Sequence, residues 1–432
     1  MKIAIVGTGY QGLVVGTCLA ETGHQVTCLE ADPERLSALQ AGTLPFHEPG
    51  LEELLVRNLE EERLTFSSNV AQVIDDCLSI LFCVNPPVDE EGKVDTRELL
   101  ELAATVASSM NGYRLFVNKG ACPPGTAAAL ESVFRANTDQ PFDVVVNPDF
   151  LKAGKAVDDF MHPDRVVVGC EDVRVQELIR EIYSPFVRTG RPILFMNQAS
   201  AEISKYATNV MLASRISVMN QLADICTAVG ADIARVREGL ACDERIGNTF
   251  LFPGLGYAGS YMPGDVAACQ RFGEEQGVDV DLIRAIQGVN QRRQDGFERT
   301  IRDHFQGALS GKVIGFWGAT FKPRTDDIRG SVAVRLIDAF LEEGAIIQVH
   351  DPVAGPSLRR RYADRVTIAA KPYDATSGAH GLVITTEWSN YHRPNFARMT
   401  EEMAAPVIFD GRNLYQPDVL QKEGFTYFSI GR

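Results

Sequence analysis

The chain has 432 residues, which exceeds one ordinary hydrophobic core and favours two or three domains. Its 45% hydrophobic and 23% charged residues are typical of a globular protein, and its net charge of −15 argues against nucleic acid or an anionic membrane as a partner. The nine cysteines are scattered singly, without metal-type spacing. We therefore expect reduced thiols, no bound metal, no secretion signal, a cytoplasmic location and a small ligand.

The first elements predict a βαβ unit. The apolar run at residues 3–6 stops at glycines, an amphipathic stretch covers residues 13–22, and a second strand-like run covers residues 26–29. Further β-like runs alternate with helical patterns, as in a doubly wound parallel sheet, at residues 79–84, 115–118, 144–146 and 165–169. We place this Rossmann domain at residues 1–195.

The middle of the chain changes to long helical periodicity, from residue 199 to about residue 293. We expect a helical central domain at residues 196–300; core packing explains its pattern as well as dimerisation does, but we expect a homodimer. A second strand-helix-strand unit begins near residue 312 and predicts a C-terminal domain at residues 301–432. The predicted fold class is α/β, with two Rossmann-like doubly wound domains joined by helices, and the cleft between such domains is the default ligand site.

The segment after the first strand fits the dinucleotide fingerprint Gly-x-Gly-x-x-Gly, through Gly7, Gly9 and Gly12. Such glycines allow a tight turn and a close approach of backbone N–H groups to a pyrophosphate. Glu30 follows at the end of the second strand, where a carboxylate accepts hydrogen bonds from a ribose and repels a 2′-phosphate. The combination favours NAD over NADP; the alternative is that the glycines serve only packing and Glu30 is a surface charge.

A series of ordered motifs resembles the UDP-glucose/GDP-mannose dehydrogenase family over nearly the whole chain. The matching segments are residues 42–55 with His47-Glu48-Pro49-Gly50-Leu51-Glu52, 147–151, 162–166, 202–209, 245–247, 321–329 and 386–388. The resemblance implies an N-terminal NAD domain, a helical dimer-forming centre and a C-terminal domain that holds the nucleotide sugar. It also implies that a sugar primary alcohol is oxidised twice, through an aldehyde that a cysteine attacks.

The family's cysteine motif is Gly-Gly-Ser-Cys-Phe-Pro-Lys-Asp, and residues 258–265 of this chain read Ala-Gly-Ser-Tyr-Met-Pro-Gly-Asp. Tyr261 thus stands where the resemblance places the nucleophile. A phenol, with a pKa of about 10 against about 8.5 for a thiol, is a poor substitute in that chemistry. Two further departures fall near the expected thioester: a hydroxyl is missing at Ala121, and Asp149 replaces a glutamate.

The residues that the resemblance assigns to the first oxidation are present. Lys205 and Asn209 are spaced i,i+4, so that an ammonium and an amide share one helix face and can meet one oxygen. Asp265 can take the alcohol proton as a general base. Spacing alone leaves open a solvated helix face for the first two and a helix N-cap for Asp265.

The resemblance also implies the ligand contacts. The cofactor residues are Gly7, Gly9, Tyr10, Gln11, Gly12, Glu30, Arg35, Pro86, Ala121, Lys322 and Arg329. The substrate residues are Asp149, Phe150, Leu151, Lys152, Lys205, Asn209, Arg245, Phe250, Tyr257 and Gly259. For Lys322 and Arg329, structural salt bridges are the alternative.

We therefore predict an NAD-dependent nucleotide-sugar dehydrogenase that performs one two-electron oxidation. A secondary alcohol fits best because it stops at the ketone, and octose assembly in a lincosamide antibiotic pathway is one such setting. Tyr261 then either fills space, which we prefer, or donates a hydrogen bond to the substrate. The alternatives are an acid-forming enzyme with Cys122, or less favourably Cys269, as a displaced nucleophile, and a non-catalytic relative that binds NAD or a nucleotide sugar.

Overall fold

The computed structural model describes residues 1–188 and 190–432, which divide into two compact units. Unit 1 comprises Met1–Thr208 and Ala267–Gln276, and unit 2 comprises Asn209–Val266 and Gly277–Arg432. Helices α9 (Gln198–Val229) and α11 (Met262–Glu275) each contribute residues to both units. Each unit contains one β-sheet, whereas the division into three domains at residues 195 and 300 stays a prediction.

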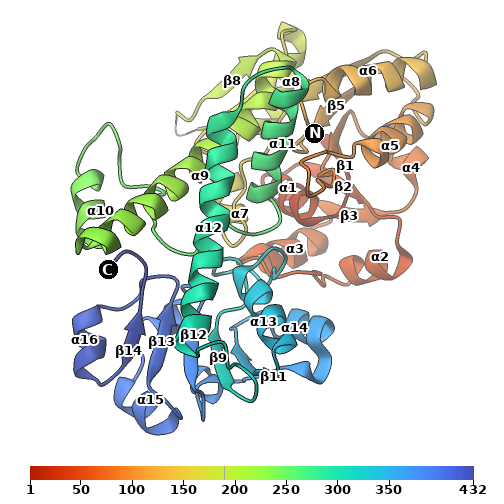
Figure 1. Cartoon of the computed structure of the whole chain (residues 1–432). Coiled ribbons are helices and arrows are strands. Elements are labelled where there is room, and N and C mark those ends of the chain that lie inside the picture. Colours follow the sequence, from red (N-terminus) through yellow and green to blue (C-terminus); the bar gives the residue numbers. More distant parts are fainter. Residues whose placement is uncertain (189) are drawn as a thin grey trace. The chain divides into compact units, whose positions relative to one another are not determined.

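Unit 1 is built on an eight-stranded sheet (Figure 1). Its strands are β1 (Lys2–Val6), β2 (Gln25–Leu29), β3 (Leu64–Ser67), β4 (Ser79–Phe82), β5 (Arg114–Asn118), β6 (Phe142–Val146), β7 (Val166–Gly169) and β8 (Ile193–Met196). Their order is β3-β2-β1-β4-β5-β6-β7-β8. The chain therefore reverses its direction of winding between β1 and β4, and in such sheets ligands bind beside the carboxyl ends of the strands at that point.

The direction of the last two strands differs from the predicted parallel pattern. β7 is antiparallel to β6, and β8 is parallel to β7. Residues 147–165 leave β6 and enter β7 at the same edge of the sheet, so no crossover to the opposite edge is needed. This connection keeps residues 149–152 at the carboxyl edge of β6.

The helices of unit 1 join these strands. They are α1 (Tyr10–Glu21), α2 (Pro33–Gln40), α3 (Leu51–Glu60), α4 (Val70–Asp76), α5 (Arg97–Ser108), α6 (Thr126–Asn137), α7 (Ala156–Met161) and α8 (Val173–Tyr183). Alternate residues of β1 enter two different core clusters, with Ile3 and Ile5 in one and Ala4 and Val6 in the other. Both faces of the sheet are therefore covered, which is why its strands are short continuous apolar runs.

Unit 2 contains a six-stranded parallel sheet in the order β11-β10-β9-β12-β13-β14. The strands are β9 (Val313–Trp317), β10 (Ile346–His350), β11 (Thr367–Ile368), β12 (Gly381–Ile384), β13 (Val407–Asp410) and β14 (Thr426–Phe428). Its remaining helices are α10 (Ile233–Ala241), α12 (Asp281–His304), α13 (Val332–Glu342), α14 (Gly355–Tyr362), α15 (Phe396–Glu402) and α16 (Pro417–Lys422). The second strand-helix-strand unit is confirmed by β9, α13 and β10, and with it the α/β fold class.

The long helical pattern in the middle of the chain is also confirmed, by α9 and α12, which are green and teal in Figure 1. The two helices pack within unit 2. The Ser217 hydroxyl of α9 donates to the carbonyl of Ile286 at 2.9 Å, and Arg293 of α12 donates to the carbonyl of Asn220 at 3.0 Å. The buried faces of these helices explain the apolar periodicity.

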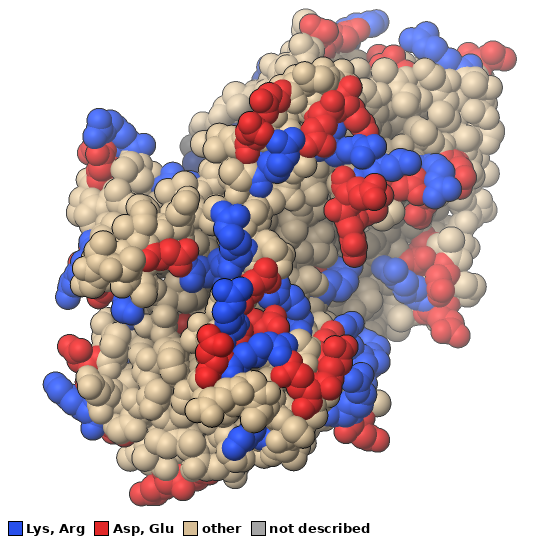
Figure 2. Space-filling view, viewed as in Figure 1, with Lys and Arg blue, Asp and Glu red and all other residues tan. Residues whose placement is uncertain are grey.

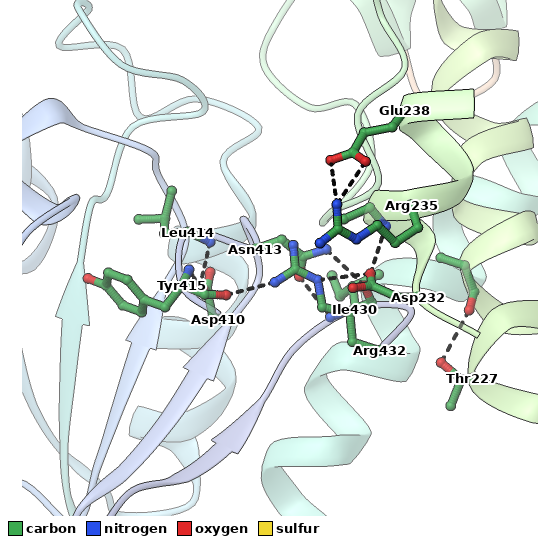
Figure 3. Close-up of polar contacts among 12 residues, drawn as sticks. Thr227, Asp232, Arg235, Glu238, Asp410, Asn413, Leu414, Tyr415, Ile430 and Arg432 are labelled. Carbon is green, nitrogen blue, oxygen red and sulfur yellow. Dashed lines mark hydrogen bonds and ion pairs between the residues drawn. The ribbon is translucent and has the colours of Figure 1, made fainter. Parts of the chain in front are cut away.

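The last residues of the chain tie α10 to the second sheet (Figure 3). The Arg432 guanidinium donates to the carbonyl of Tyr415 at 2.7 Å and lies 3.5 Å from the carboxylate of Asp232, the N-cap of α10. Asn413 and Ile430 exchange two hydrogen bonds, of 2.8 and 2.9 Å. These contacts fix the start of α10, the helix that leads into the loop of Arg245.

Two surface properties bear on partners. Among the described residues, no helix is long and apolar enough to cross a membrane. On the face shown in Figure 2, acidic and basic side chains are interspersed.

Candidate functional site

The turn after β1 has the geometry of a dinucleotide-binding loop. Gly7 has φ +97°, and a Cβ on Gly12 would lie 1.8 Å from the Gly7 carbonyl oxygen, so neither position accepts a side chain without rearrangement. Around Gly9 a Cβ would meet nothing within 4 Å. Gly9 is the N-cap of α1 and makes no side-chain capping bond, so the first amides of the helix are available to a phosphate.

Glu30 lies at the end of β2 and is already oriented by this turn. One carboxylate oxygen accepts from the Thr8 hydroxyl, and the other accepts from the amide of Asp32 at 2.9 Å. Arg35 lies 3.3 Å from Glu30 and donates to the Thr8 carbonyl at 2.5 Å. Glu30 is only 9% exposed, so the alternative that its carboxylate is merely a charge on the protein surface is excluded. A carboxylate held here suits the ribose hydroxyls of NAD.

Pro86 and Ala121 follow β4 and β5 at the carboxyl edge of the first sheet. Asn85, next to Pro86, accepts a hydrogen bond from the Ala121 amide at 3.1 Å. The two loops are therefore held together beside the switch in strand order, where Ala121 presents a methyl group instead of a hydroxyl.

Asp149 contacts two residues, Gln11 and Lys205, that were predicted for different roles. One of its oxygens accepts from the Gln11 side-chain amide, and the other accepts from the Lys205 ammonium at 3.1 Å. The side chain of Lys205 is 12% exposed and that of Asp149 is 13% exposed. The solvated helix face that spacing left open for Lys205 is thus excluded.

The neighbouring substrate candidates line the same edge of unit 1. The Phe150 ring lies 3.7 Å from the Arg165 guanidinium and 5.8 Å from Lys205 Nζ. Leu151 packs against the core, and Lys152 pairs with Asp159 at 2.8 Å. The Phe150 ring therefore lies beside the Lys205 ammonium. The Lys152 side chain is half exposed.

Sequence reasoning assigned no role to two buried glutamates that hold these loops. Glu48 accepts from the amides of Gly154 and Ala156 at 2.6 and 2.7 Å, and from the Tyr10 hydroxyl at 2.5 Å. Glu202 accepts from the amides of Gly125 and Ala127 at 2.7 and 2.8 Å.

Each of these glutamates therefore caps a helix whose preceding loop contains site residues. Both lie in the segments that carry the family resemblance, which was the one available signal. A carboxylate that caps a helix far away in sequence leaves no local pattern.

In unit 2, Asn209 and Asp265 form a pair. The Asn209 side-chain amide donates to the Asp265 carboxylate at 2.5 Å, and Asp265 is only 6% exposed. Asp265 lies in the first turn of α11, where its amide donates to the carbonyl of Tyr261 at 2.9 Å. Tyr261 therefore precedes the helix at the cap position, and the alternative that Asp265 is an N-cap is wrong.

Tyr261 lies beside Arg329 and Asp327, also in unit 2. Asp327 accepts two side-chain bonds from Arg329, at 2.9 and 2.8 Å, and one from the Ser260 hydroxyl at 3.3 Å. The side-chain hydrogen bonds that Arg329 donates to Asp327 raise the pKa of the Arg329 guanidinium, and the nearby Tyr261 phenol contributes in the same direction. The Gly259 amide donates to the Gly330 carbonyl at 3.1 Å, so both loops are joined.

The remaining predicted contacts are spread over unit 2. Lys322 lies 5.7 Å from the Phe321 ring, and Arg245 is 87% exposed and pairs with Asp243. Phe250 is half-buried with φ +57°. Tyr257 is buried, and its backbone is held by the side chain of Asn290 at 2.9 and 3.0 Å. The ligand roles of these residues stay predictions.

Cys122 does not have the properties of a nucleophile. It is 3% exposed in a core cluster, and burial raises the pKa of its thiol to about 12. A buried, protonated thiol is inert. Cys269 is partly exposed, on α11 one turn beyond Asp265.

Three segments of the chain match one family. Residues 1–187 match the NAD binding domain, residues 199–292 the central domain and residues 315–417 the UDP binding domain of the UDP-glucose/GDP-mannose dehydrogenase family.

Curated relatives match over the full length of the chain. A UDP-glucose 6-dehydrogenase of Pseudomonas aeruginosa is 40% identical and covers 100% of this chain and 98% of its own length. A UDP-glucose 6-dehydrogenase of Rhizobium meliloti is 36% identical with 100% of both chains covered. Among solved structures, a UDP-glucose dehydrogenase of Pyrobaculum islandicum is 31% identical with a TM-score of 0.90, covering 99% of this chain and 96% of its own.

Proposed function

Because the chain belongs to the UDP-glucose/GDP-mannose dehydrogenase family and is an NAD-dependent nucleotide-sugar dehydrogenase, we propose that it performs a single two-electron oxidation and releases a carbonyl product. The observation that carries this proposal is Tyr261, at the position where the family resemblance places the cysteine nucleophile. A phenol at this position cannot supply the thiolate that forms the thiohemiacetal, so the cysteine route from an aldehyde to an acid is missing at this residue.

The proposed chemistry uses the residues assigned to the first oxidation. NAD held at the glycine turn after β1 would supply the hydride acceptor, and the sugar alcohol would become a carbonyl group. Asp265 takes the hydroxyl proton, and Asn209 holds its carboxylate in place through the bond at 2.5 Å. Lys205, one turn before Asn209 on α9, stabilises the negative charge that develops on the oxygen.

The substrate in this proposal is a nucleotide sugar, with a UDP-sugar as the first candidate. The match to a UDP binding domain and the names of the relatives support the uridine base. A secondary alcohol is the preferred reacting group, because its ketone has no second hydride to give. None of these relatives is named for an antibiotic pathway, so that setting has no support here and the proposal does not depend on it.

Tyr261 is proposed to be fixed in place rather than to fill space alone. Its phenol lies near the Arg329 guanidinium and the residue directly precedes α11, and both features support a set orientation. Tyr261→Phe separates the two roles. A pure space-filler keeps kcat within about twofold in this variant, whereas loss of an ordered hydroxyl lowers kcat about tenfold or more.

An acid-forming UDP-glucose 6-dehydrogenase is the second candidate, and the relative at 40% identity favours it. By the family's cysteine route it would need another thiol, and the burial of Cys122 opposes that residue. Under our proposal Cys122→Ala changes no product. Loss of acid formation in this variant would support the second candidate instead.

The product decides between the two. The purified protein is incubated with NAD and a panel of UDP- and GDP-sugars, and the products are treated with hydroxylamine and weighed by mass spectrometry. A trapped ketone or aldehyde supports our proposal, and a uronic acid contradicts it. Tyr261→Cys, with UDP-glucose, then tests whether this one side chain blocks the second oxidation.

We also propose a homodimer through α9. Four large apolar side chains lie on one face of the helix, one or two turns apart, and are exposed: Met211 at 64%, Val218 at 55%, Ile225 at 53% and Val229 at 71%. A second copy of the chain covers such a stripe. Sedimentation of Val218→Asp at micromolar concentration is expected to give monomers where the parent gives dimers.

A further inference from the structure

The first turn of α1 makes an unusual side-chain contact. Gln11 is the second residue of the helix and only 3% exposed. Its Nε2 donates both to the carbonyl of Lys119, at 2.8 Å, and to the carboxylate of Asp149. Both partners are acceptors, so the amide must present its N–H groups to them. Among the described residues, its Oε1 is buried without a hydrogen-bond partner.

The unpaired oxygen indicates which part of the Gln11 side chain an apolar residue could not replace. A buried acceptor without a donor is destabilising, and an apolar side chain of the same shape would avoid that cost. What Gln11 alone supplies is its pair of N–H bonds. One of these bonds reaches the residue that holds Lys205.

Each oxygen of the Asp149 carboxylate accepts a hydrogen bond as a result. Oδ2 faces Gln11, and Oδ1 accepts from Lys205 Nζ at 3.1 Å. The Phe150 ring, 5.8 Å from Nζ, borders the ammonium as well. Lys205 is thus held by a carboxylate that is itself held from the dinucleotide turn, all within unit 1.

We propose that Gln11 is a positioning residue for the oxidation. It holds the Asp149 carboxylate against Lys205, so that the turn that takes the dinucleotide also fixes the ammonium that stabilises the sugar oxygen. This inference rests on the role of Lys205 in the proposed function, and it holds whether the sugar is oxidised once or twice.

The test compares Gln11→Leu with Thr17→Val. Thr17 lies on the same helix, is 1% exposed, and its hydroxyl has no partner among the described residues. Each change removes one buried polar group from α1, but only the first removes a contact to Asp149. Asp149→Ala and the double variant Gln11→Leu/Asp149→Ala complete a cycle.

The first measurement needs no substrate. Each protein is pulse-labelled with acetic anhydride, and acetylation of Lys205 is measured by peptide mass spectrometry relative to the exposed Lys2, which has 62% side-chain exposure. Gln11→Leu is expected to raise Lys205 labelling at least about fivefold, and Asp149→Ala by at least as much. The double variant is expected to match Asp149→Ala, and Thr17→Val is expected to match the parent.

Acetylation of the buried Lys119 is the control for a general loss of structure, because its ammonium donates hydrogen bonds to Asn147 and Tyr183. Parent-like Lys205 labelling in Gln11→Leu would overturn the proposal. Labelling of Lys119 together with Lys205 would also overturn it, because Gln11 would then support the fold in general. An additive effect in the double variant would show that Gln11 does not act through Asp149.

The second measurement is a split between binding and turnover, with the sugar that the panel identifies. Gln11→Leu is expected to lower kcat about tenfold or more while the NAD dissociation constant, measured by calorimetry, changes less than about threefold. A large rise in the NAD dissociation constant with an unchanged kcat would assign Gln11 to cofactor binding and contradict the proposal. The number of NADH molecules formed per sugar, which tests the proposed function, is expected to be the same in Gln11→Leu as in the parent, so the two ideas fail separately.

Discussion

The two sheets contain the same strand-helix-strand unit, but the turn after the first strand differs. In unit 1, α1 starts at Tyr10, directly after the glycine turn, and its N-cap makes no side-chain bond. In unit 2, residues 318–331 separate β9 from α13, whose N-cap Ser331 accepts from the amide of Ala333 at 3.2 Å. No side chain caps the first amides of α1, where a pyrophosphate can bind, whereas a serine hydroxyl already caps one of those of α13.

The acidic residue after the second strand is used differently as well. Glu30 accepts from Thr8 and Asp32 and ends the second strand, where we predict that it meets the ribose of NAD. Asp351, which follows β10, accepts from the amides of Ala319 and Thr320 at 2.8 and 3.3 Å and from the indole of Trp388 at 3.2 Å. Asp351 is thus a structural acceptor. The comparison teaches that the turn, and not the βαβ pattern, determines whether such a unit binds a dinucleotide.

The largest expected effect is a loss of NAD affinity when the glycine turn after β1 is disrupted. In Gly12→Ala the new Cβ would meet the Gly7 carbonyl oxygen at 1.8 Å, so the turn must rearrange. We expect NAD affinity to fall more than about 100-fold, or about 2.7 kcal/mol. Calorimetry with NAD measures this loss. Gly296→Ala, in α12 where a Cβ would meet nothing within 4 Å, is the control and keeps the parent affinity.

The next effect separates the two carboxylates. Glu30→Ala is expected to weaken NAD binding about tenfold, or about 1.4 kcal/mol, and to narrow the preference for NAD over NADP, with little change in unfolding. Asp351→Ala is expected to cost about 3 kcal/mol of stability, because it leaves buried donors without an acceptor, and to leave the NAD to NADP ratio unchanged. Binding titrations and urea denaturation measure the two effects. If Glu30→Ala lowered the stability and Asp351→Ala weakened NAD binding, the proposed difference between the two acidic residues would be wrong.

The smallest effect concerns acid stability of the second unit. Burial lowers the pKa of His350 below its ordinary 6.5, and its Nδ1 lies 2.8 Å from the Tyr391 hydroxyl. The unfolded chain therefore binds more protons than the folded one below pH 6.5, and stability falls as the pH falls. We expect a loss of at most about 1 kcal/mol over the first pH unit below 6.5, measured by urea denaturation.

The controls for this effect are two further variants. His350→Gln should remove that part of the pH dependence, and the exposed His392→Gln should keep it. An unchanged pH slope in His350→Gln would show that other groups cause the acid sensitivity.

Much of the fold could be predicted because local sequence patterns determine the individual strands and helices. The apolar runs, the glycine turn and the helical periodicity located β1, α1, β9 and α13. The direction of β7 could not be predicted, because the alternation of side chains is the same in parallel and antiparallel strands. Only the connection through residues 147–165 determines it.

The site shows the same division. Lys205 and Asn209 were found from their spacing and motif, since both lie on one helix. The contact of Gln11 with Asp149 joins residues 138 positions apart, and the caps formed by Glu48 and Glu202 also act over long separations. Such pairings depend on how the loops at the sheet edge meet, which no local pattern records. The sequence alone also left Asp351 without a role.

The most direct test of the account is the stoichiometry of NADH. A limiting, weighed amount of the sugar that the protein turns over is reacted to completion with excess NAD, and the NADH formed is read from its absorbance. Since we propose that Tyr261 occupies the position of the family's cysteine, the account predicts one NADH for each sugar consumed. Two NADH for each sugar would contradict it.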